Sequence, residues 1–339
     1  MTIAAVSVLG TGAWGTTFAQ VLAHAGRTVT MWGRNPQTVE QINSGSNARY
    51  LPGIRLAETI RATTDPQLAI DGADLVVVAL PTQTIRSTLP QFRALATCPV
   101  PILSLAKGLE DGTNKLVTDV ITESLGVDIE QVAALSGPNL AREIIECQPT
   151  ATVIAAENES VGAAIAEACH NEYFRPYLTT DLIGCEIAGA TKNVIAVAVG
   201  ASEGLGWGAN TRTTLITRGL AEMTRYGIAR GARAETFAGL AGMGDLIATC
   251  SSKLSRNYSF GYRIGQGKTV EQAYALSTGV VEGAKTAMPL TQHARSLCVD
   301  VPIAEAVADV LSGEETIATM GKRLLGRPRK KDGWAIELI

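Results

Sequence analysis

The stretch "IAAVSVLGTGAWGTTFAQVLAHAG", Ile3 to Gly26, decides the fold of the first half of the chain. It opens with a nearly continuous apolar run to Leu9 that includes β-branched residues, as expected of a strand buried on both faces. A helix is predicted from Thr16 to Ala25, ending at Gly26. "RTVTMWGRN", which follows directly, predicts the next strand. The order strand, turn, helix, strand is that of a dinucleotide-binding unit.

Three glycines occupy the turn between this strand and this helix, spaced as G-x-G-x-x-G at Gly10, Gly12 and Gly15. Glycines let the backbone turn sharply and approach a pyrophosphate, whose negative charge then faces the N-terminus of the helix. The motif alone is weak, but its place between a buried strand and a helix makes it specific. The alternative is a turn that tolerates glycine and binds no ligand.

Further apolar segments alternate with helical patterns up to about residue 180, and this alternation predicts an open, mainly parallel sheet. The segments are "ADLVVVALP", "VPILSLAKG", "VAALSGPN", which leads into a helix near Asn139, and "TATVIAA". We therefore expect an α/β domain over residues 1–180, with a Rossmann-like, doubly wound sheet. From "TTDLIGCEIAGATKNVIAVAVG" onward long helical segments prevail, so we expect an all-helical domain over residues 181–339.

Length and composition agree with this division. The chain has 339 residues, of which 46% are hydrophobic and 18% charged, and its formal net charge is -3. No apolar run reaches the length needed to span a bilayer, and the N-terminus lacks the pattern of a signal peptide. The cysteines are scattered, without metal-binding spacing. We expect a cytoplasmic protein with no metal site and no integral membrane contact, and a basic tail, "GRPRKKDG", that is solvated and binds no nucleic acid.

One lysine stands alone in an apolar helix. Lys192 is the only charged residue between Ile187 and Gly200, and a helix of this composition has no polar face. A buried ammonium is costly unless it is paired or has a function, and burial lowers the pKa of a lysine toward neutrality. These properties suit a proton donor to a carbonyl, so Lys192 is the candidate catalytic residue. The alternative is a structural lysine paired with a carboxylate such as Glu186 or Asp245.

A polar cluster follows the glycine-rich run "FAGLAGMGDL", which brings Asp245 into place. Arginine offers a planar fork to phosphate, and serine and asparagine add neutral donors, so the cluster predicts an anion site for a phosphorylated substrate. The alternative is a polar surface loop. The cluster comprises Ser251, Ser252, Lys253, Ser255, Arg256 and Asn257.

Lys107 lies at the end of a predicted strand, where its side chain would face a bound ligand. The alternative is a solvated lysine on a loop.

The second predicted strand ends in "MWGRNP", where NAD-preferring folds place an acidic residue about 20 residues past the fingerprint. Gly33, Arg34 and Asn35 occupy this window, so no carboxylate is there to repel a 2′-phosphate. Arg34 can stack on adenine and pair with that phosphate. We predict that NADPH is used at least as well as NADH. The alternative is that Arg34 only stacks on adenine and serves both cofactors alike.

Motifs along most of the chain together resemble the NAD(P)-dependent glycerol-3-phosphate dehydrogenases of the bacterial type. They are "GTGAWGTTFA", "LAKGLE", "SGPNLARE", "GATKNV", "GMGDL", "SRNYSFG" and "VVEGAKTA", in this order. The resemblance implies a homodimeric enzyme that reduces dihydroxyacetone phosphate to sn-glycerol 3-phosphate with NAD(P)H, for glycerophospholipid synthesis. Departures are small: Ala13, Asn139, Thr191 and Met243 replace residues more usual in that family.

The resemblance also implies roles for individual residues. It makes Lys192 the proton donor or acceptor. Besides the fingerprint glycines, the residues implied to contact the cofactor are Trp14, Arg34, Tyr50, Lys107, Ala141, Arg256, Val280 and Glu282. Those implied to contact sn-glycerol 3-phosphate are Lys107, Gly137, Asn139, Lys192, Asp245, Ser255, Arg256 and Asn257.

Two other functions compete with this one. A 3-hydroxyacid dehydrogenase also joins a dinucleotide-binding domain to a helical domain, but it uses a lysine followed four residues later by an asparagine. Here Ala196 holds that position. A redox-sensing protein could hold a dinucleotide without turnover, but it would not need both a buried lysine and a separate phosphate cluster.

Overall fold

The computed structural model describes residues 2–327, and most of the tail "GRPRKKDG" lies outside them. By its internal contacts the chain forms two compact units. The first comprises Met1–Glu110 and Lys115–Glu186, and the second comprises Asp111–Asn114 and Ile187–Ile339. The domain boundary near residue 180 stays a prediction.

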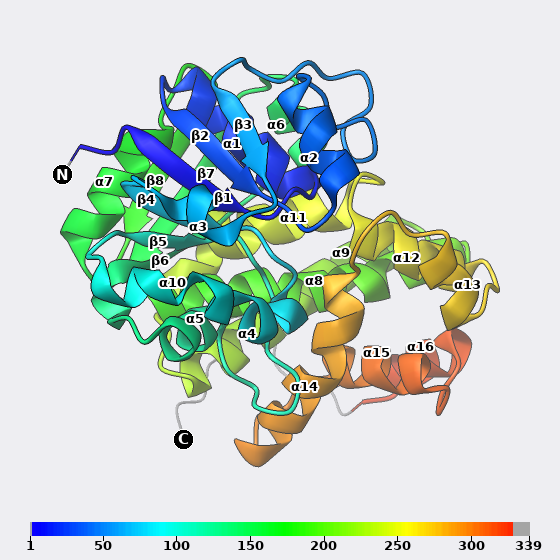
Figure 1. Cartoon of the computed structure of the whole chain (residues 1–339). Helices are drawn as coiled ribbons and strands as arrows, with labels where there is room; N and C mark the ends of the chain where they lie inside the picture. Colours follow the sequence, from blue (N-terminus) through cyan, green and yellow to red (C-terminus); the bar gives the residue numbers. More distant parts are fainter. Residues whose placement is uncertain (1, 328–339) are drawn as a thin grey trace. The chain divides into compact units, whose positions relative to one another are not determined.

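The first unit is built on one sheet. Its strands are β1 (Ala5–Leu9), β2 (Thr28–Trp32), β3 (Ile60–Thr63), β4 (Leu75–Val78), β5 (Ile102–Ser104), β6 (Val132–Ser136), β7 (Thr150–Ala156) and β8 (Phe174–Thr179). Among the described residues the strand order is β3-β2-β1-β4-β5-β6-β7-β8 (Figure 1). Strands β1 to β6 run parallel, whereas β7 is antiparallel to β6 and parallel to β8. The order reverses between β1 and β4, which is where doubly wound sheets bind their ligands.

Helices cover both faces of this sheet and enclose two cores. Val6 and Val8 of β1 pack on one face with Phe18, while Leu9 packs on the other face with Phe92. This alternation of buried residues confirms the doubly wound fold. The helices are α1 (Ala13–His24), α2 (Pro36–Asn43), α3 (Pro66–Ile70), α4 (Ile85–Thr88), α5 (Val117–Leu125), α6 (Ala141–Ile145) and α7 (Glu159–Cys169), with 3₁₀ turns η1 (Thr82–Thr84), η2 (Leu89–Thr97) and η3 (Ile129–Gln131).

The structure differs from the sequence-based prediction in three elements of this unit. Helix α1 begins at Ala13 rather than Thr16, because Gly12 is its N-cap and the third fingerprint glycine already lies in the first turn. Strands β3 and β8 were not predicted. β3 is four residues long and half polar, and β8 contains Pro176 and several exposed side chains, so neither has the apolar run of a central strand.

The second unit is helical in the residues that the structure describes, as expected. Its helices are α8 (Leu182–Gly204, which begins in the first unit), α9 (Ala209–Ala229), α10 (Ala234–Ala238), a π-helical turn η4 (Leu240–Gly244), α11 (Asp245–Cys250), α12 (Arg256–Gly265), α13 (Val270–Ala275), α14 (Glu282–Ser296), α15 (Pro302–Ser312) and α16 (Ile317–Leu325).

Helix α8 is the central element of this unit. Every residue from Gly184 to Ser202 is buried. The expectation that no apolar segment is long enough to span a membrane is wrong for α8, whose 23 residues meet that criterion by length and composition. However, 94% of its most apolar window is buried within the protein, which is typical of a core helix.

Helices α8 and α12 approach so closely that glycine is required at their contact. A Cβ atom on Gly200 would lie 2.0 Å from the carbonyl oxygen of Tyr258, and one on Gly261 would lie 2.0 Å from that of Val197. One turn further along, Gly204 and Gly265 face each other in the same way. The two backbones are therefore in direct contact, and no side chain can be inserted between them.

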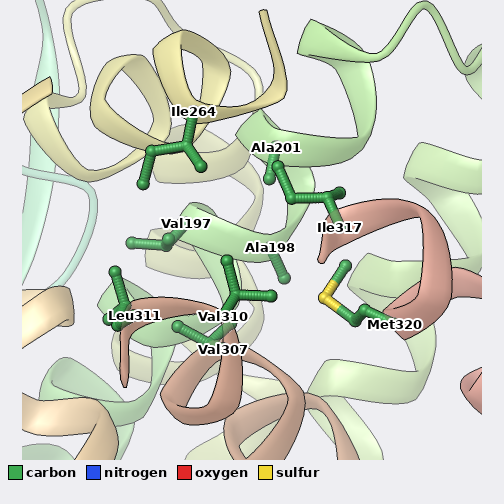
Figure 2. A pocket seen from close by; sticks show the side chains of 9 residues that line it. All are labelled: Val197, Ala198, Ala201, Ile264, Val307, Val310, Leu311, Ile317 and Met320. Carbon is green, nitrogen blue, oxygen red and sulfur yellow. The ribbon is translucent and has the colours of Figure 1, made fainter. Parts of the chain in front are cut away.

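Beyond this contact, α8 and α12 meet α15 and the segment from Ile317 around a small cavity (Figure 2). Every side chain that lines it is apolar, so it has no polar group that would hold a ligand or an ordered water. We regard it as a packing gap of the core. The lining residues are Val197, Ala198, Ala201, Ile264, Val307, Val310, Leu311, Ile317 and Met320.

The close contact between α8 and α12 predicts that a single added methyl group strongly destabilises the protein. Gly261→Ala should lower the free energy of unfolding by about 3 kcal/mol, because the new Cβ overlaps backbone that cannot move aside. Gly162→Ala is the control, since a Cβ on this α7 glycine meets its neighbours at 3.4 and 3.7 Å, and alanine favours a helix by up to about 1 kcal/mol. Urea denaturation measures both, and equal stability of the two variants would contradict the close approach.

Candidate functional site

The fingerprint turn follows β1, and its glycines have different reasons to be glycine. A Cβ on Gly10 would lie 2.5 Å from the carbonyl oxygen of Ala79, and one on Gly15 would lie 2.4 Å from that of Gly10, so packing within the chain requires both. Gly12 has an ordinary extended backbone, with φ -72° and ψ 175°. A Cβ there would meet no described atom within 4 Å. Approach of a pyrophosphate to the backbone would explain this glycine, so the turn fits a dinucleotide.

An open pocket lies beside this turn. Two arginines, Arg34 and Arg49, are the charged residues of its lining, and the Arg49 guanidinium lies 5.4 Å from the centre of the Tyr50 ring. Buried Asn47 donates from Nδ2 to the carbonyl oxygen of Thr11 (3.0 Å), which ties the segment of Arg49 and Tyr50 to the fingerprint. The lining comprises Thr11, Arg34, Asn35, Pro36, Gln37, Thr38, Arg49 and Tyr50.

The pocket brings together Arg34 and Tyr50, which were both predicted to contact the cofactor. Arg49 was missed. A cation next to Tyr50 was the only signal for it in the sequence, and nothing in the pattern showed that this loop turns back to the fingerprint.

Three predicted substrate residues lie at the carboxyl ends of β5 and β6. Lys107 donates from Nζ to the carbonyl oxygen of Gly137 (3.1 Å), across the two adjacent strands. Asn139 donates from Nδ2 to the hydroxyl of Thr152 (3.0 Å), which itself donates to the carbonyl oxygen of Ser136 (2.8 Å). The buried Oδ1 of Asn139 accepts no hydrogen bond from any described residue.

The other predicted cofactor residues lie at the starts of helices. Trp14 is in the first turn of α1, and Ala141 is the first residue of α6; Thr17 of α1 donates to the carbonyl oxygen of Ala141 (3.4 Å). In the second unit, Glu282 is the first residue of α14 and Val280 precedes it. That these residues contact a cofactor stays a prediction.

In the second unit Lys192 is held by two side chains of α11. Its Nζ donates to Asp245 Oδ1 and to Thr249 Oγ1, both at 2.7 Å, and Thr249 also donates to Asp245 Oδ1 (3.2 Å). The exposed fractions of the three residues are 7%, 1% and 3%. The carboxylate of Asp245 opposes the positive charge of the ammonium directly, and the cluster as a whole is largely shielded from solvent. Thr249 was missed, although it follows Asp245 by one helical turn.

Glu186, the other carboxylate considered as a partner of Lys192, has a different role. Its Oε1 accepts a hydrogen bond from the backbone N–H of Thr118 (3.1 Å), and its Oε2 accepts one from the Thr118 hydroxyl, at the start of α5. Burial raises the pKa of Glu186 to about 7. Asp245 is thus the carboxylate that pairs with the lysine.

The glycine-rich run places Asp245 through an unusual backbone. Residues Leu240–Gly244 form a π-helical turn between α10 and α11, a geometry often found at functional sites. A Cβ on Gly242 would lie 2.2 Å from the carbonyl oxygen of Phe237, so this turn can only close with glycine there. Asp245 then begins α11 and is almost fully buried.

The predicted phosphate residues lie together at the N-terminus of α12. Ser255 is the N-cap and accepts a hydrogen bond from the Tyr258 N–H (3.2 Å), and Arg256 is the first helical residue. Asn257 donates to Asn193 Oδ1 (2.8 Å) and accepts from the Gly283 N–H (2.9 Å). Ser255 and Asn257 therefore make hydrogen bonds within the protein, and their contact with a substrate stays a prediction. Asn193, the neighbour of Lys192, was not predicted.

A fingerprint turn in a doubly wound sheet, followed by a helical unit with a buried lysine–carboxylate pair, is the architecture of the two-domain dinucleotide-dependent dehydrogenases. Comparison with known families narrows this class. The N-terminal model of NAD-dependent glycerol-3-phosphate dehydrogenase matches residues 5–162, and the C-terminal model matches residues 181–322. The chain belongs to this family.

Individual relatives agree over nearly the whole length. A glycerol-3-phosphate dehydrogenase (NAD(P)+) of Corynebacterium diphtheriae is 49% identical over 329 residues, covering 96% of this chain and 99% of that protein. One of Streptomyces griseus is 46% identical over 327 residues, covering 96% and 97%. The crystal structure of glycerol-3-phosphate dehydrogenase from Coxiella burnetii superposes with a TM-score of 0.91 at 33% identity, covering 96% and 99%.

Proposed function

We propose that the protein reduces dihydroxyacetone phosphate to sn-glycerol 3-phosphate with NADPH or NADH, and that the product feeds glycerophospholipid synthesis. The observation that carries the proposal is the buried cluster of Lys192, Asp245 and Thr249. It is a candidate acid that two buried side chains hold in place, in a chain that also carries a dinucleotide fingerprint. Family membership supports the same reaction.

In this proposal Lys192 donates a proton to the carbonyl oxygen of the substrate as that oxygen becomes an alkoxide. Asp245 and Thr249 orient the ammonium and stabilise its charge before the transfer. Pairing on two sides leaves the lysine little freedom, and a positioned acid loses less entropy on reaching the transition state. Lys107 adds positive charge near the developing negative charge.

The first unit binds the cofactor. The fingerprint at Gly10, Gly12 and Gly15 would hold the pyrophosphate at the N-terminus of α1. Arg34 and Tyr50 would hold the adenosine part in the open pocket, with Arg34 facing a 2′-phosphate when NADP is bound. When bound, the nicotinamide supplies a hydride to the carbonyl carbon. The remaining cofactor contacts at Trp14, Lys107, Ala141, Arg256, Val280 and Glu282 belong to this proposal.

The substrate is recognised mainly by its phosphate. Arg256 presents a guanidinium at the N-terminus of α12, where the helix also favours an anion, and Ser255 and Asn257 belong to the same turn. Asn139 has a buried amide oxygen without a described donor, which would be satisfied by a substrate hydroxyl. Gly137 lies beside the Lys107 ammonium and completes the proposed set with Lys192 and Asp245.

We further propose a cytoplasmic homodimer without integral membrane contact. The burial of α8 supports the last point, because this core helix cannot leave the fold to enter a bilayer. Analytical ultracentrifugation measures the oligomeric state. The rival 3-hydroxyacid dehydrogenase and the non-catalytic sensor are separated from the proposal by one assay, NADPH oxidation by purified protein with and without dihydroxyacetone phosphate.

Lys192→Met should lower kcat by about 100- to 10,000-fold, the usual loss on removing a general acid, while NADPH still binds. Methionine keeps the apolar packing but leaves Asp245 unpaired, so the double variant with Asp245→Asn separates lost stability from lost catalysis. Stopped-flow turnover and quenching of NADPH fluorescence are the two measurements. A kcat near the wild-type value would refute the assignment.

Arg256→Ala should raise KM for dihydroxyacetone phosphate by roughly 10- to 100-fold, because one charge-assisted hydrogen bond contributes about 1.5–3 kcal/mol. Turnover of unphosphorylated dihydroxyacetone should change far less. Lys268→Ala, which removes an exposed charge just after α12, is the control. If both substrates lose equally, Arg256 does not recognise the phosphate.

Arg34→Ala should reduce kcat/KM for NADPH more than for NADH. The described pocket lining contains no carboxylate that would repel a 2′-phosphate, and Arg34 would pair with that phosphate. The wild type should use NADPH at least as well as NADH. Steady-state kinetics with both cofactors decide the matter. Equal losses would show that Arg34 only stacks on adenine, and a strong wild-type preference for NADH would contradict the prediction.

A further inference from the structure

The segment between α13 and α14 passes directly over the guanidinium of Arg256. Gly279, in this segment, has a left-handed backbone with φ +92°. A Cβ at this position would lie 2.6 Å from Arg256 Nη1 and 3.8 Å from Arg256 Cζ. The guanidinium thus occupies the space that a side chain at position 279 would fill.

This segment is fixed to the same helix that carries Arg256. At its start, Arg263 of α12 donates from Nη1 to the hydroxyl of Ser277 (3.1 Å). Just beyond its end, in the first turn of α14, the Gly283 N–H donates to Asn257 of α12 (2.9 Å). These two contacts with α12 oppose a withdrawal of the segment, so we expect a side chain at position 279 to displace the end of the arginine.

The group that would shift is a side chain and not the backbone. The atom that a Cβ on Gly279 would meet first is Nη1 of Arg256, at the far end of a long, flexible side chain. At Gly283, by contrast, a Cβ would lie 2.2 Å from the backbone oxygen of Asn193, which cannot rotate away. A side chain at position 279 should therefore change the direction of the guanidinium rather than the stability of the unit.

We propose that Gly279 is a positioning residue for phosphate recognition: its missing side chain is the space in which the Arg256 guanidinium lies, and this fixes the direction of its N–H groups. The proposal rests on the proposed function, in which Arg256 binds the substrate phosphate. A planar fork is selective for phosphate only when its orientation is set, so the glycine acts on the substrate through the arginine.

Gly279→Ala and Gly267→Ala form a matched pair. Both glycines have a left-handed backbone, with φ +92° and +89°, and so carry the same penalty for alanine. No described atom lies within 4 Å of a Cβ on Gly267. Gly279→Ala should raise KM for dihydroxyacetone phosphate roughly tenfold, as expected when one charge-assisted hydrogen bond is weakened, with kcat retained. Gly267→Ala should leave KM unchanged, and thermal unfolding of the two should agree.

The double variant of Gly279→Ala and Arg256→Ala tests whether Gly279 affects KM through Arg256. If Gly279 acts through Arg256, adding Gly279→Ala to Arg256→Ala should not raise KM further. Gly279→Asn, which tolerates a left-handed backbone better, replaces Gly279→Ala if that variant does not fold, with Gly267→Asn as its control. The proposal is overturned if Gly279→Ala has the wild-type KM for dihydroxyacetone phosphate, or if Gly267→Ala raises this KM equally. It is also overturned if Gly279→Ala raises KM by the same factor when Arg256 has already been replaced by alanine.

Thermal stabilisation by sn-glycerol 3-phosphate gives a readout that needs no turnover. The ligand should stabilise the wild type and Gly267→Ala equally, and Gly279→Ala less. If the wild type does not oxidise NADPH with dihydroxyacetone phosphate, the proposed function fails. The shift in unfolding temperature on adding sn-glycerol 3-phosphate still tests the role of Gly279 in that case. Equal shifts in all three proteins would overturn it.

Discussion

The direct backbone contact between α8 and α12 is the constraint on which the second unit depends. The first helix carries Lys192 and Asn193, and the second carries Arg256 and Asn257. Because glycines at 200 and 261 let the two backbones touch, the hydrogen bond between Asn193 and Asn257 can form at 2.8 Å. A helix pair separated by ordinary side chains, at the usual spacing of roughly 8–10 Å between axes, would hold the proposed acid and the proposed phosphate site further apart.

The proposed role of Lys192 as an acid would explain a buried ion pair that stability alone does not require. Removing both charges from water costs more than a surface pair does, and apolar residues of the same shape would often be at least as stable. The cost is limited here because Thr249 and Asp245 together satisfy the ammonium with short hydrogen bonds. What the fold gains is a charged donor with a fixed position, which a solvated lysine would not provide.

The sequence predicted those parts that depend on local pattern. The fingerprint between β1 and α1 is a local signal, as is the single charge in α8, and the helical character of the second unit follows from periodicity. Asn193 could not be found in this way, because its partner Asn257 lies far off in the chain. Thr249 and Arg49 each stand near a predicted residue, but only the fold shows that Thr249 reaches Lys192 and that Arg49 lines the pocket beside the fingerprint. Nor could the sequence tell Gly279 from Gly267, two left-handed glycines that differ only in what stands beside them. Strands β3 and β8 were not predicted because tertiary pairing, and not a continuous apolar run, makes them strands.

The burial of α8 from Gly184 to Ser202 has a consequence for the dynamics of the protein. Segments that open locally are those with few buried contacts, whereas a helix enclosed on all sides exchanges its amide hydrogens only when the whole unit opens. Lys192 is held in the middle of such a helix. The proposed acid therefore does not depend on a segment that frays or on an exposed loop. On heating or in denaturant, Lys192 should keep its position until the unit that contains α8 unfolds.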